Sequence, residues 1–246
     1  MLVGTLLMLI AASSLLVGAG HVTELSVAEE QPIGTLVGSV RQHPDVVQLM
    51  TSSLRFNFRF SSGPYELFSV DERSGEISTS KRVDRERLCP SDVPTASASS
   101  SSCSLELDVT VLPHRYYRIL KVSIEVIDVN DNAPAFPQPR LSLEMKESSP
   151  IGSRVPVPAA DDPDAGEFGV QRYELVESSS SSSFRLAVSE RSDGGSDVWL
   201  TLGRLLDREQ LRTYTLSIVA YDGGTPPKSG SVNIQVLTGI MTIPRY

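Results

Sequence analysis

The stretch Asp128-Val129-Asn130-Asp131-Asn132-Ala133-Pro134 (the linker run) lies between two parts of the chain that each have the pattern of a complete β-rich domain. Its Asp and Asn side chains, and the backbone carbonyl groups between them, are the hard oxygen ligands that Ca²⁺ prefers. Pro134 favours an extended conformation at Ala133, where the chain leaves the run. Asn and Asp are also common in turns, so the run alone fits a solvated turn equally well. The sequence on either side decides between these interpretations.

Two copies of one set of short motifs flank the linker run. Each copy has an acidic residue shortly before Pro-Ile-Gly and, further on, an Asp-Arg-Glu triplet. Along the chain these are Glu29-Glu30-Gln31-Pro32-Ile33-Gly34, Val83-Asp84-Arg85-Glu86, Glu147-Ser148-Ser149-Pro150-Ile151-Gly152 and Leu206-Asp207-Arg208-Glu209, and the second copy adds Asp162-Pro163-Asp164-Ala165-Gly166 and Ala220-Tyr221-Asp222. Glu29 and Glu147 are 118 residues apart, a little more than the roughly 100 residues of an immunoglobulin-like sandwich. The pattern indicates a repeated domain with insertions.

Apolar and polar residues alternate in several segments of both copies, as is typical of strands with one face in a core and the other in water. The alternating segments are 54–60, 104–111 and 122–126 in the first copy, and 214–220 and 232–236 in the second. Their apolar members are expected to form the cores, and Trp199 is expected to be a core aromatic residue of the second copy. The chain is therefore predicted to be built from β-sandwiches rather than helices.

Together these motifs resemble the cadherin superfamily, from about Val22 to Val236. The resemblance implies an all-β fold of two tandem Greek-key, immunoglobulin-like β-sandwich cadherin domains, joined by a calcium-binding linker. The expected divisions are a signal peptide at 1–20, a first cadherin domain with linker at 21–132, a second cadherin domain at 133–237, and an atypical tail at 238–246.

The resemblance also implies calcium ligands from the end of the first domain, the linker run and the start of the second domain. The expected side-chain ligands are Glu29, Asp84, Glu86, Asn130, Asp131, Asp162, Asp164 and Asp222, and the expected carbonyl ligands are Val129, Asn132 and Phe168. Phe168 stands where the family usually has Asn, although the ligand there is the backbone carbonyl. The spacing to Tyr173 favours Asp162 over Asp161 as the calcium ligand. Glu30 is a lesser alternative to Glu29 as the ligand before Pro-Ile-Gly.

The resemblance also implies about three Ca²⁺ ions at this junction. Without them the acids would repel one another and the domains would swing freely, and with them the joint would stiffen. Glu147, Asp207 and Glu209 repeat the ligands of the first domain, but Thr238–Tyr246 contains no second linker run. We therefore expect one complete junction and an incomplete second metal half-site. This ending predicts a truncated product, a spliced form or an incomplete gene model of a longer receptor.

The chain has two cysteines, Cys89 and Cys103. Two cysteines in one exported domain are expected to form a disulfide, and the alternative is a pair of free thiols. A metal site is disfavoured because none of the histidines has ligand spacing to either cysteine. A cysteine pair after Asp-Arg-Glu is similar to the protocadherin branch, where such a bridge closes a loop. The loop is longer here because of the serine-rich tract Thr95–Ser102, which is predicted to be solvated.

Composition fits an exported, cation-binding protein. The chain has 246 residues, enough for about two domains, and a formal net charge of −8, which disfavours nucleic-acid binding. Residues 1–20 are mostly apolar and end in small residues, so they are predicted to be a signal peptide. A buried first strand is the alternative, but these residues do not alternate. No later segment has the roughly 18 apolar residues of a membrane span.

The resemblance implies a calcium-dependent homophilic adhesion module of a protocadherin-like receptor at the plasma membrane. The expected partner is the same or a related protocadherin on an apposed cell, without a nucleic-acid or small-molecule partner. Membrane attachment would come from a C-terminal part that this chain lacks. The alternative is a secreted form that acts as a soluble competitor of the full-length receptor. An enzyme is disfavoured, because the chain contains neither GxSxG nor HExxH and its clustered acids are too numerous for a catalytic pair.

Overall fold

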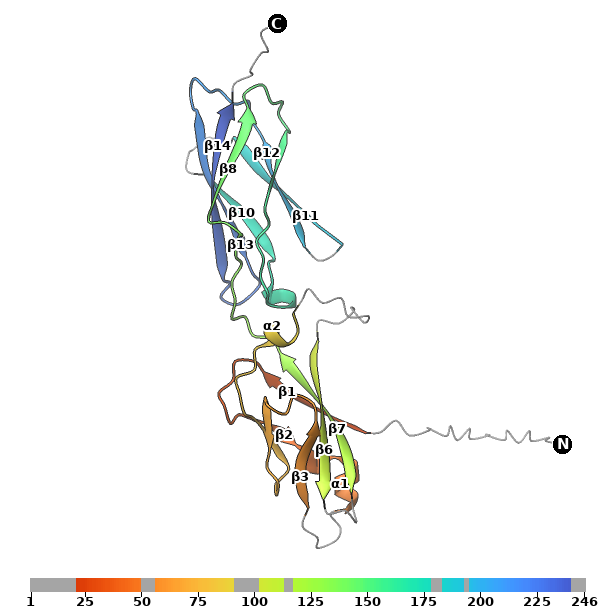
Figure 1. Cartoon of the computed structure of the whole chain (residues 1–246). Coiled ribbons are helices and arrows are strands. Elements are labelled where there is room, and N and C mark those ends of the chain that lie inside the picture. The colour runs from red at the N-terminus through yellow and green to blue at the C-terminus, as the bar shows by residue number, and fades with distance from the viewer. Residues whose placement is uncertain are drawn as a thin grey trace, which may run out of the picture. The chain divides into compact units, whose positions relative to one another are not determined.

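The computed structural model describes residues 21–49, 56–90, 102–112, 117–177, 183–192 and 195–239, which form two β-sandwiches (Figure 1). The predicted signal peptide, Leu54, nearly all of the serine-rich tract and the tail after Gly239 lie outside the described residues. The chain divides into two compact units, the second of which contains the described parts of Ala28–Glu30, Asp84–Cys103 and Val126–Tyr246. The domain boundary at residues 132 and 133 stays a prediction.

The first sandwich consists of a four-stranded sheet and a three-stranded sheet, with three short helical segments. The larger sheet has the order β1 (Val22–Ala28), β7 (Arg118–Ile127), β6 (Cys103–Leu112) and β3 (Asn57–Ser62). The smaller sheet has the order β2 (Leu36–Ser39), β5 (Glu76–Thr79) and β4 (Phe68–Val70). The helical segments are η1 (Val40–Gln42), α1 (Pro44–Leu49) and α2 (Arg85–Leu88), of which α2 belongs to the second compact unit although it lies in this half of the sequence. The helices were not predicted, whereas the strands follow the predicted alternation.

The core of the first sandwich is formed by alternate residues of these strands. Phe58 on β3 pairs with Val111 on β6, and both side chains are buried. On β7 the buried residues include Val122, Ile124 and Val126, each separated by a polar residue that faces away. Because successive side chains of a strand point to opposite faces, this pattern places a single apolar layer between the sheets. The predicted core faces of segments 104–111 and 122–126 are confirmed.

The second sandwich repeats the topology of the first. Its larger sheet has the order β10 (Arg172–Glu177), β13 (Thr213–Tyr221), β14 (Ser229–Gly239) and β8 (Arg140–Lys146). Its smaller sheet has the order β11 (Phe184–Glu190), β12 (Ser196–Leu202) and β9 (Arg154–Val157), and η3 (Gly166–Phe168) precedes β10. β14 pairs with β8 in parallel, and the other pairs of this sandwich are antiparallel. The identical strand order in both units matches the repeated sequence motifs.

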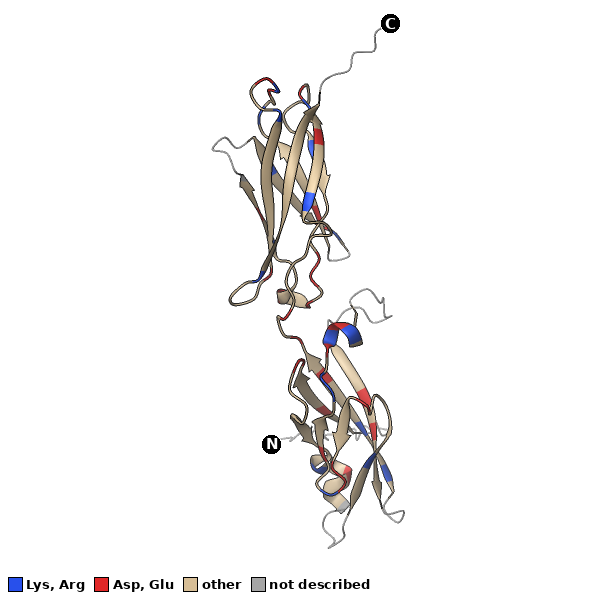
Figure 2. Cartoon of the chain, turned by 60° about the vertical axis from the view of Figure 1, so that its left-hand side comes forward, with Lys and Arg blue, Asp and Glu red and all other residues tan. Residues whose placement is uncertain are grey.

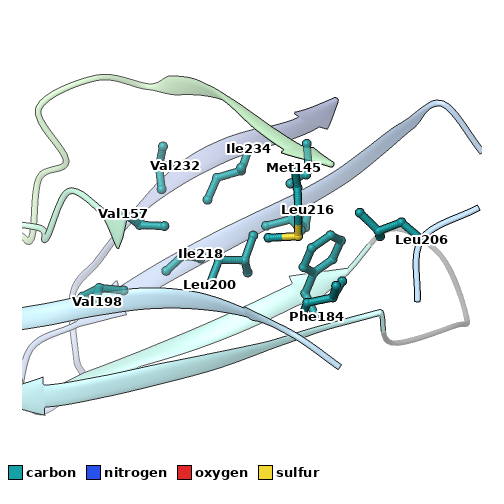
Figure 3. Packing of buried hydrophobic residues seen from close by; sticks show 12 residues of the cluster. Met145, Val157, Phe184, Val198, Leu200, Leu206, Leu216, Ile218, Val232 and Ile234 are labelled. Atoms are coloured by element: carbon teal, nitrogen blue, oxygen red, sulfur yellow. The ribbon is translucent and has the colours of Figure 1, made fainter. Parts of the chain in front are cut away.

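A close-packed apolar cluster fills the second sandwich (Figure 3). Leu216 and Ile218 on β13 meet Ile234 and Val232 on β14 across the antiparallel register, and all four are buried. The prediction for Trp199 was wrong, because this residue is only half-buried and lies outside the cluster. Its neighbours Val198 and Leu200 are the buried residues of β12. In a strand of period two, those neighbours place Trp199 on the opposite face of the sheet.

Candidate metal centre

Eight carboxylates from separate segments lie in the second compact unit, and we call them the acid cluster. They are Glu29, Asp84, Glu86, Asp128, Asp131, Asp162, Asp164 and Asp222. Glu29 follows β1, the next two belong to the start of α2, two more come from the linker run after β7, and the rest lie on loops of the second sandwich. Figure 2 shows acidic residues on these irregular segments. Loops at the end of a sandwich bring together residues that are distant in sequence.

Glu29 connects three of these segments. Its side chain is fully buried, and its N–H donates to the Ile127 carbonyl over 3.0 Å. Its Oε2 accepts from the Arg85 N–H at 2.7 Å, and its Oε1 accepts from the Val129 N–H at 2.9 Å. Each of its carboxylate oxygens therefore accepts a hydrogen bond from a backbone N–H, one in α2 and one in the linker run. A charged acceptor makes such hydrogen bonds stronger than neutral ones.

Helix α2 brings Glu86 close to acids from other segments. The Asp84 side chain caps the helix by accepting from the Arg87 N–H at 3.0 Å. Oxygen atoms of Glu29, Glu86 and Asp131 lie within 4.8 Å of one another, and oxygen atoms of Glu86, Asp128 and Asp164 do so as well. Carboxylates this close repel one another strongly in a partly buried place unless a cation or a proton lies among them.

Amide groups of the linker run hold the aspartates of the second sandwich. The Asn132 side-chain amide donates to Asp164 Oδ1 at 2.6 Å, and its backbone N–H donates to Asp164 Oδ2 at 3.1 Å. The Asn130 amide donates to Asp222 Oδ2 at 2.8 Å. A side chain at Gly224 would collide with this Asn130 amide, so glycine lets the linker run approach the loop. The linker run is thus fixed to the second sandwich by its own side chains.

Several oxygen atoms of the acid cluster and of the linker run are buried without a hydrogen-bond partner among the described residues. They are Glu86 Oε1, Asp128 Oδ1, Asn130 Oδ1 and Asp162 Oδ2. An unpaired buried carboxylate or amide oxygen is energetically costly, and native structures rarely leave one unsatisfied. Carboxylate and amide oxygens are also the ligands that Ca²⁺ takes, in sets of six to eight. The residues present therefore fit a hard divalent cation.

The pKa values of the cluster reflect burial and mutual repulsion. Burial, together with the nearby charges of Glu29 and Asp128, raises the pKa of Glu86 to about 7. Burial, with the charges of Asp164 and Asp222, likewise raises the pKa of Asp162 to about 6, and burial and Glu29 raise that of Asp131. Burial alone would raise the pKa of Asp222, but hydrogen bonds from Asn130, Gly224 and Lys228 bring it below its usual value.

These shifts predict that mild acid stabilises the chain when no metal is bound. Because the pKa of Glu86 is about 7 in the folded chain, against an ordinary value of 4.5, the folded state binds more protons than the unfolded state between those values. The melting temperature of the calcium-free chain should therefore rise as the pH is lowered from about 8 to about 5.5. Calcium affinity should fall over the same range, because protons compete with calcium for the same oxygens.

The measurement is thermal unfolding by circular dichroism after calcium has been removed by dialysis. The pKa values of Asp71 and Asp108 are lowered in the folded chain, so these groups stabilise it at pH values above their ordinary pKa of 3.8. This stabilisation is lost only at lower pH, outside the range of the experiment. Glu86→Gln is the control, since it should remove much of the pH dependence. A melting temperature that falls on acidification in this range would contradict the pKa shifts.

The structure brings most of the predicted ligands together and adds one residue. Asp128 was quoted as the start of the linker run but was not among the predicted ligands. Its Oδ1 is one of the buried unpaired oxygens, and its Oδ2 accepts from the Ala165 N–H at 2.8 Å. Phe168 ends η3, where its N–H donates to the Ala165 carbonyl at 3.1 Å. The carbonyl ligands Val129, Asn132 and Phe168, and the metal ligands as a whole, stay predictions.

The second half-site repeats the backbone arrangement around Glu29. The Glu147 N–H donates to the Gly239 carbonyl, and Glu147 Oε1 accepts from the Arg208 N–H, both at 3.3 Å. The Asp207 side chain accepts from the Gln210 N–H at 3.1 Å, as Asp84 does in α2. Among the described residues, however, neither Glu147 nor Asp207 nor Glu209 belongs to a close group of three acids. This half-site therefore repeats the backbone geometry of the first, but the described residues place no close group of carboxylates around it.

Cys89 and Cys103 form the predicted disulfide, with an S–S distance of 2.02 Å. Cys89 is the C-cap residue directly after α2, and Cys103 is the buried first residue of β6. The bridge therefore fixes the end of the helix that carries Asp84 and Glu86. Within the described parts of the chain, no helix is long and apolar enough to cross a membrane.

Family models match both halves of the chain. The model described as "Cadherin domain" matches residues 141–237, and the one described as "FAT4-like, N-terminal cadherin-like domain" matches residues 20–128. Protocadherin-11 X-linked of Homo sapiens is 34% identical over 216 residues, which cover 86% of this chain and 16% of that protein. Protocadherin 18 of Mus musculus is 33% identical over 210 residues, which cover 85% of this chain and 18% of that protein.

Solved structures agree with these relatives. The crystal structure of protocadherin gamma C5 EC1-3 superposes with a TM-score of 0.75 at 34% identity, over 88% of this chain and 65% of that one. The structure of mouse clustered PcdhgC3 EC1-3 gives a TM-score of 0.71 at 32% identity, again over 88% of this chain and 65% of that one. The chain spans less than a fifth of the two curated relatives named above. It belongs to the cadherin superfamily, as a protocadherin-like member with two extracellular cadherin repeats.

Proposed function

We propose that the two repeats form a calcium-dependent, homophilic cell–cell adhesion module of a protocadherin-like receptor. The observation that carries the proposal is the acid cluster, with two overlapping groups of close carboxylates and four buried oxygens that lack hydrogen-bond partners. Bound Ca²⁺ would give these oxygens the positively charged partner that they lack among the described residues. The chain's own residues would hold it: Glu29, Glu86 and Asp131 as one group, and Glu86, Asp128 and Asp164 as the other.

The segments that supply the acids also explain why calcium would make the interdomain junction rigid. Glu29 and Asp128 lie directly after β1 and β7 of the first sandwich, whereas Asp164 and Asp222 lie on loops of the second. Ions shared among these segments would restrain the chain at each of those positions at once. Without the ions, mutual repulsion of the acids would favour a looser arrangement.

The adhesive part of the proposal is supported by the family. Both family models and the named relatives are cadherins or protocadherins, and these adhesion domains are not enzymes. The proposed partner is the same or a related protocadherin on an apposed cell, and the proposed location is the cell surface, as part of a longer receptor. The comparisons do not favour a secreted competitor over this function.

The calcium part is tested by thermal unfolding of the chain in millimolar calcium and in chelator. A ligand present at about 100 times its Kd stabilises the folded state by about 2.7 kcal/mol, which corresponds to a rise of several degrees in melting temperature. Asp131→Asn should lose most of this rise. Glu144→Gln, which neutralises an exposed acid of β8 that belongs to no close group of acids among the described residues, is the control and should keep it.

An equal melting temperature in both conditions would rule out the calcium site. The homophilic part needs a separate measurement, namely sedimentation equilibrium of the chain with and without calcium. Self-association that appears only with calcium supports the module. A chain that binds calcium but stays monomeric at high concentration would show that these two repeats are not sufficient for homophilic binding.

A further inference from the structure

Arg85 is a buried cation inside the acid cluster. Its side chain is only 6% exposed, whereas that of Arg87, two residues further along α2, is 85% exposed. In Figure 2 the short helix α2 is mostly coloured as charged, because its sequence is Arg-Glu-Arg-Leu. The Arg85 Nη1 atom lies 3.6 Å from Glu86 Oε1 and 3.5 Å from Asp128 Oδ1. A buried arginine that faces two carboxylates from different segments is an electrostatic partner of the cluster rather than a solvated side chain.

The two oxygens that face Arg85 are among the four oxygens of this site that are buried without a hydrogen bond to any described residue. At these distances the guanidinium offsets their charge but does not satisfy them as hydrogen-bond acceptors. Both oxygens also belong to acids of the group formed by Glu86, Asp128 and Asp164. Arg85 therefore lies close enough to stabilise the acids without a metal, and its charge would repel a metal ion among them.

We propose that Arg85 is a tethered counter-ion of the acid cluster, which stabilises the metal-free state and thereby lowers the affinity for divalent cations. The inference rests on the proposed function, since the cation is the one that the cluster would bind. It follows from linkage: an interaction that stabilises only the unbound state must be given up in binding, and so weakens binding by the same free energy.

The charge of the cluster is consistent with this role. The eight carboxylates carry eight negative charges when ionised, and Arg85 supplies one positive charge. Lys228 supplies another: its charge opposes the rise in the pKa of Asp131 that burial causes, and it contributes to the lowered pKa of Asp222. Arg87 adds a third positive charge 3.7 Å from Asp84, but its side chain is 85% exposed and its charge is therefore screened by solvent. The acids still outnumber the bases, so the cluster keeps a net negative charge for divalent ions to neutralise. Without Arg85, the same ions would face one more negative charge and would be held more tightly.

The test compares Arg85→Met, which keeps an unbranched apolar stem, with Arg85→Lys, which keeps the charge. The Arg85 backbone N–H that donates to Glu29 is present in both variants. Arg208→Met is the matched control, because Arg208 has the same place in the second Asp-Arg-Glu motif, whose acids belong to no close group of three in the part of the chain that the structure describes. Melting temperature in chelator and calcium affinity by calorimetry are measured on the whole chain.

Arg85→Met should melt several degrees lower than wild type in chelator and should bind calcium about tenfold more tightly, the effect of removing one charge near a partly buried ion. Arg85→Lys and Arg208→Met should keep calcium affinity close to that of wild type. If Arg85→Met weakens calcium binding, or leaves the melting temperature in chelator unchanged, the counter-ion role is wrong. If wild type itself binds no calcium, the proposed function fails, whereas the measurements in chelator still show whether Arg85 stabilises the cluster.

Discussion

Replacement of Glu29 by alanine is expected to lower the free energy of unfolding by about 3 to 5 kcal/mol in calcium. Its carboxylate is fully buried and accepts from the Arg85 and Val129 N–H groups at 2.7 and 2.9 Å. Each hydrogen bond to a charged acceptor contributes about 1.5 to 3 kcal/mol, and the variant leaves both donors without this partner. It also removes a carboxylate from the group that contains Glu86 and Asp131.

The loss should be smaller in chelator, because removal of one of several close carboxylates relieves repulsion when no cation is present. Glu147→Ala is the matched control. Glu147 has the same place in the second repeat, but it is exposed, and the hydrogen bond that its side chain accepts from the Arg208 N–H is 3.3 Å long. It should change stability by less than about 1 kcal/mol. Urea unfolding of both variants, with and without calcium, measures this, and equal losses at the two positions would contradict the assigned role of Glu29.

The fold could be predicted from two kinds of local signal. Alternation identified the core faces of β6, β7, β13 and β14, because period-two patterns are specific to strands with one buried face. The repeated motifs identified two copies of one unit, which the identical strand orders of the two sandwiches match. Trp199 shows why residue type alone does not predict burial. A large aromatic residue suggests a core position, but Trp199 stands between Val198 and Leu200, which are buried, so its side chain lies on the face of the sheet that points away from the core.

The candidate site was less predictable than the fold. Asp128 and Asp131 stand in the same linker run, and nothing in their spacing shows that Asp128 would lie beside Glu86 and Asp164. Arg85 was noted only as the middle residue of Asp-Arg-Glu. Its burial depends on how α2 packs against the linker run, through the contacts of Glu29 with both. Such roles arise from contacts between distant segments, so the motif alone could not assign them.

Removal of the disulfide is expected to lower the free energy of unfolding by about 3 kcal/mol, the loop-closure contribution of a bridge between residues 14 apart. Calcium affinity should fall as well. Cys89 is the C-cap residue of α2, whose N-cap is Asp84 and whose first turn carries Glu86. The bridge connects this short helix to the buried start of β6. A four-residue helix has little stability of its own, so its acids depend on that attachment for their positions.

The double variant Cys89→Ala/Cys103→Ala is compared with wild type by urea unfolding and by calcium titration. Reductant should reproduce both effects in wild type and change nothing in the double variant, which separates loss of the bridge from the substitutions themselves. A loss of stability with unchanged calcium affinity would mean that Glu29 and the Asp84 cap hold α2 in place without the bridge. Because Glu29 contacts the backbone of the helix start and Cys89 its end, we expect both attachments to be needed.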